Sequence, residues 1–481
     1  MKLITNKVNT SYMEFFLLEK KMNLFSLQYN KVNYWQLVRF LLLKKITIKD
    51  LYFAENCIKR NYIKEMISTF SKAWKADIQF KKIKNVDIVR IRPCVTLTNN
   101  GKLDDHQYDY IDLKSKYRVL DLYALGDYVT LPECVEYNMA KAEARLILWK
   151  IKRKIFGCKS LEKKQHIILK NFLGQINKIY GTKFDIDSLE KNIQYSVHCH
   201  MIYCNYYLKI FSQLKPKIIM EYPHYDEHIF AANAAAKKLD IKTIELQHGR
   251  INAHEAYWYE DQKRDGKLLP DYFGVYGKWW AEQIKLPQFS KPIVIGNPYL
   301  EKQMLMYPKK TNISSKTLAV FSSHQNGKVL SDFIYSLNDY FYQNEIAILY
   351  KLHPNEQKIW NREYPNLIKI KNIKIIDDNT SIYSVLSKSD YAIGVNSTVF
   401  YEALAYKEIQ LFIYTMGNYE AMKPLIENKM ARPIKDKKEL IECLNTPNPV
   451  SKDDLIKDEL WESNASLRTN KIIDELINLE I

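Results

Sequence analysis

Short apolar runs alternate with amphipathic stretches through the second half of the chain. This alternation is typical of strands and helices in βαβ units around a parallel sheet. It begins near residue 214, stops in the polar stretch 309–316 and then resumes, which predicts two successive α/β units. The strands predicted for the first series are 218–222, 243–247, 272–276 and 293–295. The strands predicted for the second series are 318–321, 346–352, 368–376, 391–395 and 410–413.

The pattern is less regular over residues 1–190, which nonetheless indicate mixed α/β structure. A strand is predicted at 86–91, ended by Pro93, and a helix at 136–156, where apolar residues recur at helical spacing. We therefore expect an N-terminal α/β domain over 1–308, a Rossmann-like domain over 309–447 and a helical tail over 448–481.

Composition narrows the class of protein. The 481 residues are 47% hydrophobic and 26% charged, a mixture that folds into several soluble domains and excludes a single small module or a disordered chain. The chain has only 13 glycines and no GxxxxGK[ST] motif, which argues against P-loop nucleotide hydrolysis. Its seven cysteines form no CxxC pair and are odd in number, so a reducing cytoplasm is the expected location.

Basic residues outnumber acidic ones by 72 to 55, and the resulting charge of +17 attracts polyanions. No RNP1-like string, zinc-finger spacing or Arg-rich tract accompanies this charge, so a dedicated nucleic-acid binder is disfavoured. Nucleotide-activated substrates and anionic lipid remain. The apolar string 40–43 lies between basic residues and fits either a membrane-surface segment or a packed helix. The flank of the helix at 136–156 is also basic and fits a solvated face; its cations are Lys150, Lys152, Arg153, Lys154 and Lys159.

Residues 1–12 are polar and lack the apolar segment of a signal peptide, and the apolar strings near them are too short to span a bilayer. We therefore expect a cytoplasmic protein, with the inner face of the plasma membrane as a second, peripheral location.

Distinctive polar residues follow five of the predicted strands. In open parallel sheets, ligands bind beyond the carboxyl ends of the strands, where loops and helix N-termini present N–H donors. These strand ends are therefore where we expect the chemistry. The five runs are 221–227, 247–250, 322–324, 353–356 and 396–398.

The last of these runs, Asn396-Ser397-Thr398, precedes an apolar helical stretch. Such a run can be a simple N-cap, or it can be an anion site where hydroxyls and backbone N–H groups converge. His353-Pro354 favours the anion site, because an imidazole held at a strand end can donate to phosphate or ribose hydroxyls.

A His-Pro pair after one strand and a Ser-Thr helix start about 40 residues later resembles the bacterial GT-B glycosyltransferases of capsule and lipopolysaccharide synthesis. The nearest members are the CMP-sugar users (sialyl-, polysialyl- and Kdo-transferases) and the CDP-glycerol glycerophosphotransferases. The resemblance covers roughly residues 215–420. It implies a GT-B-like α/β fold with two Rossmann-like domains facing across a cleft.

The resemblance also implies a division of roles. Residues 1–308 would form the acceptor side and 309–447 the nucleotide-donor side. The donor's nucleotide and phosphate would be held by His353, Pro354 and the run Asn396, Ser397 and Thr398. Further candidates for stabilising the departing phosphate are Lys351, His324 and Arg250. The alternative for each is a charge on the protein surface with no role in binding.

The catalytic base is expected in the N-terminal half. The acidic pair before Gly of the sialyltransferases is missing, whereas the teichoic-acid-like members carry a His-Gly after a strand, which His248-Gly249 resembles. His248 is therefore the leading base, since an imidazole titrates near neutrality; the alternative is a histidine that only hydrogen-bonds its own loop. Asp226 and Glu227 are the next candidates, with a solvated helix N-terminus as the alternative.

No metal and no cofactor are predicted. His198, Cys199, His200 and Cys204 invite a zinc interpretation, but side chains at i and i+2 diverge on a helix and no second ligand pair has suitable spacing. Enzymes of the family named above commonly stabilise the departing phosphate with helix N-termini and side chains instead of a divalent ion. The nucleotide-activated sugar would be a co-substrate.

These observations favour a glycosyltransferase that moves a sugar from CMP or another nucleotide to a surface polysaccharide or lipopolysaccharide acceptor. Three alternatives stay open at this point: a CDP-polyol phosphotransferase of capsule polymer synthesis, a nucleotide-sugar epimerase, and a noncatalytic membrane-associated assembly protein.

Overall fold

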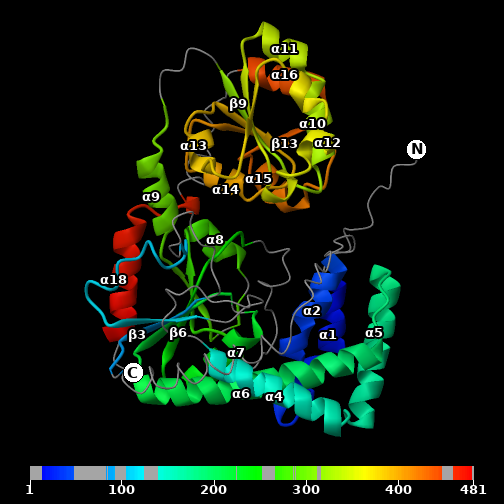
Figure 1. Ribbon diagram of the computed structural model, residues 1–481, viewed down its shortest axis with the longest axis vertical. Coiled ribbons are helices and arrows are strands. Elements are labelled where there is room, and N and C mark those ends of the chain that lie inside the picture. Colours follow the sequence, from blue (N-terminus) through cyan, green and yellow to red (C-terminus); the bar gives the residue numbers. More distant parts are fainter. Residues whose placement is uncertain are drawn as a thin grey trace. The chain divides into compact units, whose positions relative to one another are not determined.

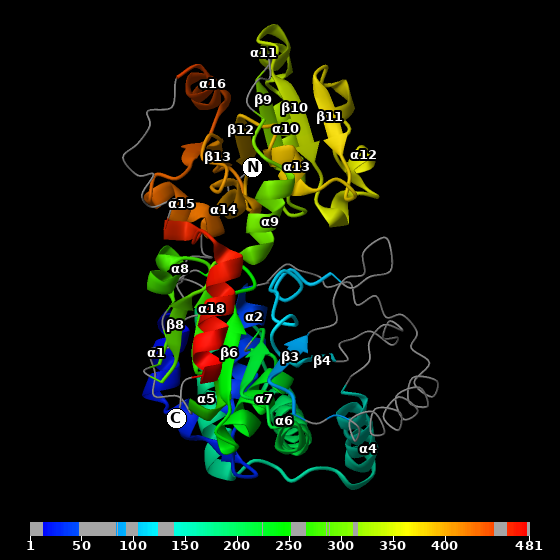
Figure 2. The ribbon, with the colours of Figure 1, turned by 90° about the vertical axis from the view of Figure 1, so that its left-hand side faces the viewer.

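The computed structural model describes most of the chain as two compact units, shown in Figures 1 and 2. Unit 1 comprises Met1–Val275, Glu282–Ile293 and Asn470–Ile481, and unit 2 comprises Tyr276–Ala281 and Val294–Thr469. The structure describes residues 13–47, 83, 85–92, 104–123, 139–223, 225–251, 266–284, 286–287, 289–310, 316–446 and 459–478.

Unit 1 is built on a six-stranded sheet with the order β4-β3-β5-β6-β7-β8. The strands from β4 to β7 pair in parallel. Every residue of β3 and β5 is buried, as expected for a parallel sheet covered on both faces. The strands are β3 Ile88–Arg92, β4 Val119–Tyr123, β5 Ile218–Glu221, β6 Lys242–Leu246, β7 Tyr272–Val275 and β8 Lys291–Val294.

The long helix α6, Ile186–Leu214, organises the helical part of unit 1 and runs beside α4 and α7 in Figure 1. It begins at Asp185, whose carboxylate accepts a hydrogen bond from the Ser188 N–H, and its buried side is rich in Tyr, His and Cys. The other helices are α1 Met13–Lys21, α2 Trp35–Thr47, α4 Ala140–Phe156, α5 Lys163–Tyr180 and α7 Glu227–Lys238, and a short hairpin joins β1 Gln28–Tyr29 to β2 Val32–Asn33.

The apolar string 40–43 lies in α2 and belongs to the core of unit 1. Leu42 and Leu43 are buried, as are Trp35 and Val38 on the same helix. Of the two interpretations that the sequence allowed, the packed helix is therefore the one observed.

Unit 2 contains a second six-stranded parallel sheet, with the order β11-β10-β9-β12-β13-β14. Figure 1 shows helices on both sides of its strands. The strands are β9 Thr317–Phe321, β10 Ala347–Lys351, β11 Ile373–Ile376, β12 Tyr391–Gly394, β13 Gln410–Tyr414 and β14 Arg432–Ile434. The helices of at least one turn are α8 Lys278–Gln283, α9 Pro298–Met306, α10 Gly327–Tyr335, α11 Asn338–Gln343, α12 Trp360–Glu363, α13 Ile382–Leu386, α14 Val399–Ala403, α15 Lys423–Glu427 and α16 Lys437–Asn445.

Two parallel, helix-covered sheets confirm the predicted fold class, α/β with two Rossmann-like units. The predicted cleft between them stays a prediction. The expected linker at 309–316 falls inside unit 2, where the Lys310 N–H donates to the Ser387 carbonyl; residues 311–315 lie outside the described part of the chain.

The last described helix, α18 Ala465–Asn478, supplies residues to both units. In unit 2, the Glu301 carboxylate accepts hydrogen bonds from the backbone N–H groups of Ala465 and Ser466, each at 3.0 Å. In unit 1, Asp474 accepts a hydrogen bond from the Tyr117 hydroxyl at 2.5 Å, and the Leu476 carbonyl accepts one from Lys242. The helix is thus anchored at both of its ends.

Among the described residues, no helix is both long and apolar enough to cross a bilayer. In the same part of the chain, no group of three or more His, Cys, Asp or Glu side chains is arranged to hold a metal ion.

Candidate functional site

The sheet of unit 2 changes direction of winding at β9. The chain adds β10 and β11 on one side of β9 and then crosses back to add β12 on the other side. The loops that leave the carboxyl ends of β9 and β12 therefore run to opposite sides of β9, and ligands bind at such a change of direction in sheets of this kind. The polar runs 322–326 and 396–398 occupy these two loops, and His353 follows β10 on the adjacent strand end.

Glu356 fixes the loops after β9 and β10 to each other. Its fully buried carboxylate accepts hydrogen bonds from the Ser322 hydroxyl at 2.9 Å and the Tyr364 hydroxyl at 2.7 Å. Its other oxygen accepts from the His353 backbone N–H at 2.8 Å. A buried carboxylate with three donors is a rigid brace, so both polar strand ends are held in place before any ligand arrives.

The imidazole of His353 is held in one tautomer. Its Nδ1 accepts a hydrogen bond from the Asn355 backbone N–H at 3.2 Å, within a capping box that begins the turn Pro354–Glu356. Because Nδ1 is the acceptor, the proton of the neutral ring is on Nε2. The half-buried His353 therefore presents an N–H donor, the form that suits a phosphate or ribose oxygen.

The loop after β12 offers hydroxyl and amide groups. Asn396 and Ser397 are half-buried and Thr398 is exposed. The Ser397 Oγ accepts a long hydrogen bond, 3.4 Å, from the Val399 N–H at the start of α14. Its own hydroxyl hydrogen is free to point elsewhere, so the helix cap and the anion site predicted from the sequence are compatible in this loop.

Two other predicted donor ligands, Lys351 and His324, differ in their surroundings. The Lys351 amine is buried and donates to the Asp377 carbonyl after β11, and burial lowers the pKa of Lys351. It therefore ties β10 to β11. His324 is exposed in the loop after β9.

Glu402, on α14 one turn beyond Thr398, was missed from the sequence. The Tyr383 hydroxyl donates a hydrogen bond to its carboxylate, and burial raises the pKa of Glu402 to about 6. An acidic residue in an apolar helical run was the available signal, because such a residue needs a partner when it is buried.

In unit 1 the corresponding change in winding falls between β3 and β5, because β4 lies on the other side of β3. The polar strand ends here are those of β5 and β6, which pair directly. They carry the run that contains Tyr222 and Tyr225 and the run that contains His248.

His248 is enclosed by aromatic rings. The Tyr222 ring stacks on the imidazole at a centroid distance of 5.8 Å, and the Tyr225 ring meets it edge-on at 5.7 Å. The Tyr225 hydroxyl and His248 Nε2 are hydrogen-bonded at 2.9 Å. Tyr225 in turn stacks on Phe40 of α2 at 4.7 Å. The ring of His248 is therefore oriented by two tyrosines of the loop after β5, one of which is itself held by α2.

The other ring nitrogen of His248 faces an acidic pair. Glu221 and Glu245 are in register on β5 and β6 and are both fully buried. Burial and the neighbouring Glu245 carboxylate raise the pKa of Glu221 well above its usual range, although Asn233 donates to it at 2.7 Å. Two adjacent buried carboxyl groups do not both ionise, and the raised pKa of Glu221 means that this residue holds a proton. The Glu245 Oε1 lies 3.7 Å from His248 Nδ1.

A buried ion-pair network supports Tyr222 from the far side. The Tyr222 hydroxyl donates to Asp105 at 2.9 Å, and Asp105 pairs with the Arg92 guanidinium at 3.2 Å at the end of β3. Arg92 also binds Asp109 at 2.8 Å. Burial raises the pKa of Asp105 although Arg92 opposes the shift. The side chains of Arg92, Asp105, Tyr222 and His248 are therefore linked by a continuous series of polar and aromatic contacts.

The other base candidates of unit 1 are not part of this set. Asp226 is half-exposed at the N-terminus of α7, 3.9 Å from His228. The Glu227 carboxylate turns toward α6, where it accepts a hydrogen bond from Ser196 at 2.5 Å, and burial raises the pKa of Glu227. Arg250 is half-buried in the loop after His248.

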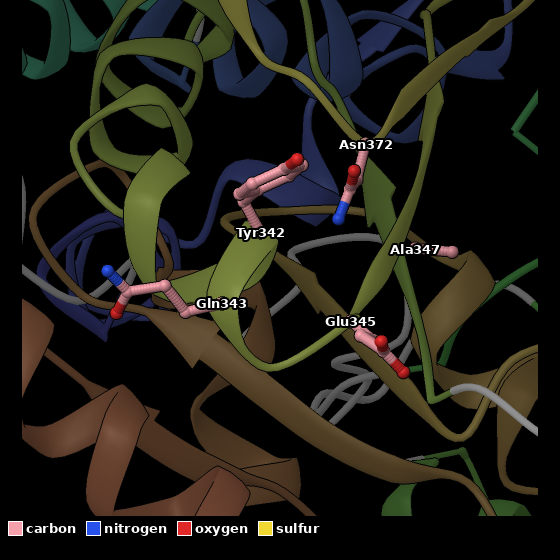
Figure 3. A pocket seen from close by; sticks show the side chains of 5 residues that line it. All are labelled: Tyr342, Gln343, Glu345, Ala347 and Asn372. Carbon is pink, nitrogen blue, oxygen red and sulfur yellow. The ribbon is translucent and has the colours of Figure 1, made fainter.

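A hollow of about 670 Å³ lies elsewhere on unit 2 and is shown in Figure 3. Its lining includes Ala347, where β10 starts, and Asn372, just before β11. The hollow therefore lies at the amino ends of the strands, whereas His353 and Ser397 lie at the carboxyl ends. We do not include it in the candidate site.

No family model and no curated protein matches this chain. Solved structures similar to it include the UDP-GlcNAc 2-epimerase from Neisseria meningitidis bound to UDP-GlcNAc, with 12% identity and a TM-score of 0.48 over 81% of this chain and 99% of that chain. The UDP-GlcNAc 2-epimerase from Methanocaldococcus jannaschii has 13% identity and a TM-score of 0.46 over 81% and 99% of the two chains. A glycosyltransferase from Rickettsia africae ESF-5 has 12% identity and a TM-score of 0.42 over 83% and 100%. This likeness concerns the fold alone and does not distinguish the activities in these names.

Proposed function

We propose that this protein is a metal-independent glycosyltransferase that moves a sugar from a nucleotide-activated donor to a surface polysaccharide or lipopolysaccharide acceptor. The observation that carries the proposal is the row of polar groups at the carboxyl ends of β10, β9 and β12, of which the first two ends are braced by Glu356. His353 offers an imidazole N–H, and Ser397 and Thr398 offer hydroxyls, to the donor's ribose and phosphate. CMP is the first expected nucleotide, because the His-Pro and Ser-Thr elements resemble those of the CMP-sugar users.

His248 acts as the base in this proposal. The acceptor oxygen attacks the anomeric carbon, the bond from that carbon to the phosphate oxygen breaks, and the acceptor's proton passes to Nε2 of His248. Tyr225 already hydrogen-bonds this nitrogen, so the proton reaches it either directly or through the Tyr225 hydroxyl. We propose that Glu245 is the ionised member of the acidic pair, because a charge 3.7 Å from Nδ1 would favour the imidazolium that forms.

The donor site can be tested with a thermal-shift panel of CMP, CDP, UDP and GDP on the full chain. A nucleotide that binds only the folded state at about 100 times its Kd stabilises the protein by about 2.7 kcal/mol. We expect one nucleotide to raise the melting temperature, and the same nucleotide to lose its effect in the His353→Ala variant. If none of the four raises the melting temperature, the donor site is wrong.

An epimerase acting on a nucleotide sugar is the second candidate. It is favoured by one feature of unit 1, the direct contact between two proton-carrying groups, Tyr225 and His248, because removing and returning a proton at carbon needs such a pair. Incubation of a nucleotide sugar in deuterated water without any acceptor separates the candidates. Deuterium incorporation at a sugar carbon indicates the epimerase, whereas acceptor-dependent loss of the donor indicates the transferase. A CDP-polyol phosphotransferase would release CMP and leave the polyol phosphate on the acceptor.

A further inference from the structure

The helix α4 has a row of apolar side chains on its solvent side. Leu148, Ile151 and Ile155 are spaced by three and four residues and so form one stripe, with exposed fractions of 54%, 45% and 68%. Phe156, at the end of the helix, is 77% exposed. The opposite side of α4, which includes the buried residues Ala142 and Leu146, is the packed one, and α4 contacts α6. The helix therefore has a second apolar side, which stays exposed among the residues that the structure describes.

Positive charge flanks this stripe on both sides. At 100° per residue, Arg145 and Lys152 fall on one flank and Lys154 on the other. Residues 144–161 contain no Asp or Glu. Arg153 is turned inward, where it donates to Gln194 at 3.2 Å and covers Trp149, so it is not part of the exposed surface. We call Leu148, Ile151, Ile155 and Phe156 with the three flanking cations the α4 surface.

An anionic lipid bilayer matches both the apolar row and the cations beside it. A solvated helix face, the interpretation the sequence favoured, would carry its cations without an apolar row between them. A nucleic acid would use the cations but leave the aliphatic row in water. An anionic bilayer takes the apolar row into the boundary between headgroups and acyl chains, and its phosphates lie level with the lysines.

We infer that the α4 surface docks this protein on an anionic lipid bilayer, with α4 lying in the plane of the interface. The inference does not depend on the proposed reaction, although an acceptor carried on a lipid would be brought close by it. At 17 residues and with its inner side packed, α4 lies on the membrane surface rather than crossing it.

The test is sedimentation of the full chain with vesicles of phosphatidylcholine alone or with phosphatidylglycerol added as one lipid in three. We expect binding only to the anionic vesicles, and weaker binding at high salt. The double variant Ile155→Ser with Phe156→Ser should bind at least about tenfold more weakly. Lys152→Glu with Lys154→Glu should weaken binding by about twentyfold or more.

Matched controls keep folding and net charge out of the result. Leu305→Ser with Met306→Ser changes two exposed apolar residues on α9, which are 79% and 57% exposed, and should bind as the unaltered chain does. Lys437→Glu with Lys438→Glu makes the same change of charge on α16 and should have a much smaller effect than the α4 pair. All variants should keep the unaltered melting temperature.

The inference is overturned if the unaltered chain does not bind anionic vesicles, or if it binds and both α4 variants bind equally well. It is also overturned if light scattering shows a dimer that the Ile155→Ser, Phe156→Ser variant dissociates, with no lipid binding by either form, because the surface then covers a second copy. Nucleotide binding is unchanged in every one of these outcomes, so the proposed function is tested separately.

Discussion

The strand-end sites of the two units differ in how their polar groups are solvated. In unit 1, His248 lies beside the fully buried Glu245 and under Tyr222 and Tyr225. In unit 2, His353, Ser397 and Thr398 are half-buried or exposed, and the His353 and Ser397 side chains accept hydrogen bonds from backbone N–H groups. Enclosed ionisable groups are suited to moving protons, whereas accessible donors on a braced frame are suited to holding a ligand.

This difference separates turnover from affinity. If unit 1 moves the proton and unit 2 holds the donor, changes in the first should alter kcat and changes in the second should alter donor affinity. The variants below test that separation.

The largest effect is expected from His248→Ala. Loss of a general base typically costs about 10²- to 10⁴-fold, so we expect kcat to fall by about 10³-fold while the Kd of the nucleotide stays within about twofold. Acceptor-dependent turnover and isothermal titration measure the two quantities. His166→Gln, on α5, is the control and should keep full activity. Full activity in His248→Ala would remove this residue as the base.

Variants of the acidic pair Glu221 and Glu245 test whether unit 1 controls kcat. Glu221 is already assigned as neutral, so Glu221→Gln preserves its charge state and its hydrogen bond from Asn233, and kcat should change little. Glu245→Gln removes the charge beside His248 and should lower kcat by about tenfold and shift its pH profile. Equal effects of the two variants would contradict the assignment of the charge.

In unit 2 we expect the opposite behaviour. Ser397→Ala combined with Thr398→Ala removes two hydroxyl donors, and at about 1 kcal/mol each the nucleotide should bind about 30-fold more weakly. Turnover at saturating donor should be nearly unchanged. Titration of the nucleotide measures the affinity, and Ser384→Ala on α13 is a control. Unchanged affinity would refute the phosphate site.

Glu402, on α14 after this loop, predicts a smaller effect, in this case on stability. Its pKa is raised from 4.5 to about 6, so the folded state binds this proton more tightly than the unfolded state. The contribution of this pKa shift to the free energy of unfolding is about 2 kcal/mol in total. It is fully present below pH 4.5 and is lost as the pH rises through about 6. Glu402→Gln should therefore be more stable than the unaltered chain above pH 6 and equal to it near pH 4.

Thermal melts from pH 4 to 7.5 measure this difference. Glu408→Gln, an exposed acid in the turn before β13, should leave the profile unchanged. A flat difference between Glu402→Gln and the unaltered chain would mean that the Glu402 carboxyl is not held neutral by burial.

The strands were predictable and the contacts between them were not. Parallel strands buried on both faces are uniformly apolar, so β5 and β9 stand out in the sequence. The strand β14 was missed because it has three residues and includes Pro433. The helix α6 was missed because its tyrosines, histidines and cysteines blur the helical period.

In the candidate site too, the positions of residues along the chain were predictable and their contacts were not. His248 and His353 were predicted because each follows a strand, a relation that the sequence contains. The brace Glu356 and the network from Arg92 through Asp105 to Tyr222 depend on contacts across different loops, which no local pattern specifies. Glu221 and Glu245 are acidic residues within apolar strands. That pattern signals a buried acid that needs a partner, and it was overlooked.

The anchoring of α18 also has a consequence for synthesis. A ribosome makes the chain from its N-terminus, so the hydrogen bonds of Lys242 with Leu476 and of Tyr117 with Asp474 form only after the final described helix has been made. The first unit is therefore completed only after the second has been translated, and a fragment ending between the two sheets would lack the residues of α18 that belong to unit 1.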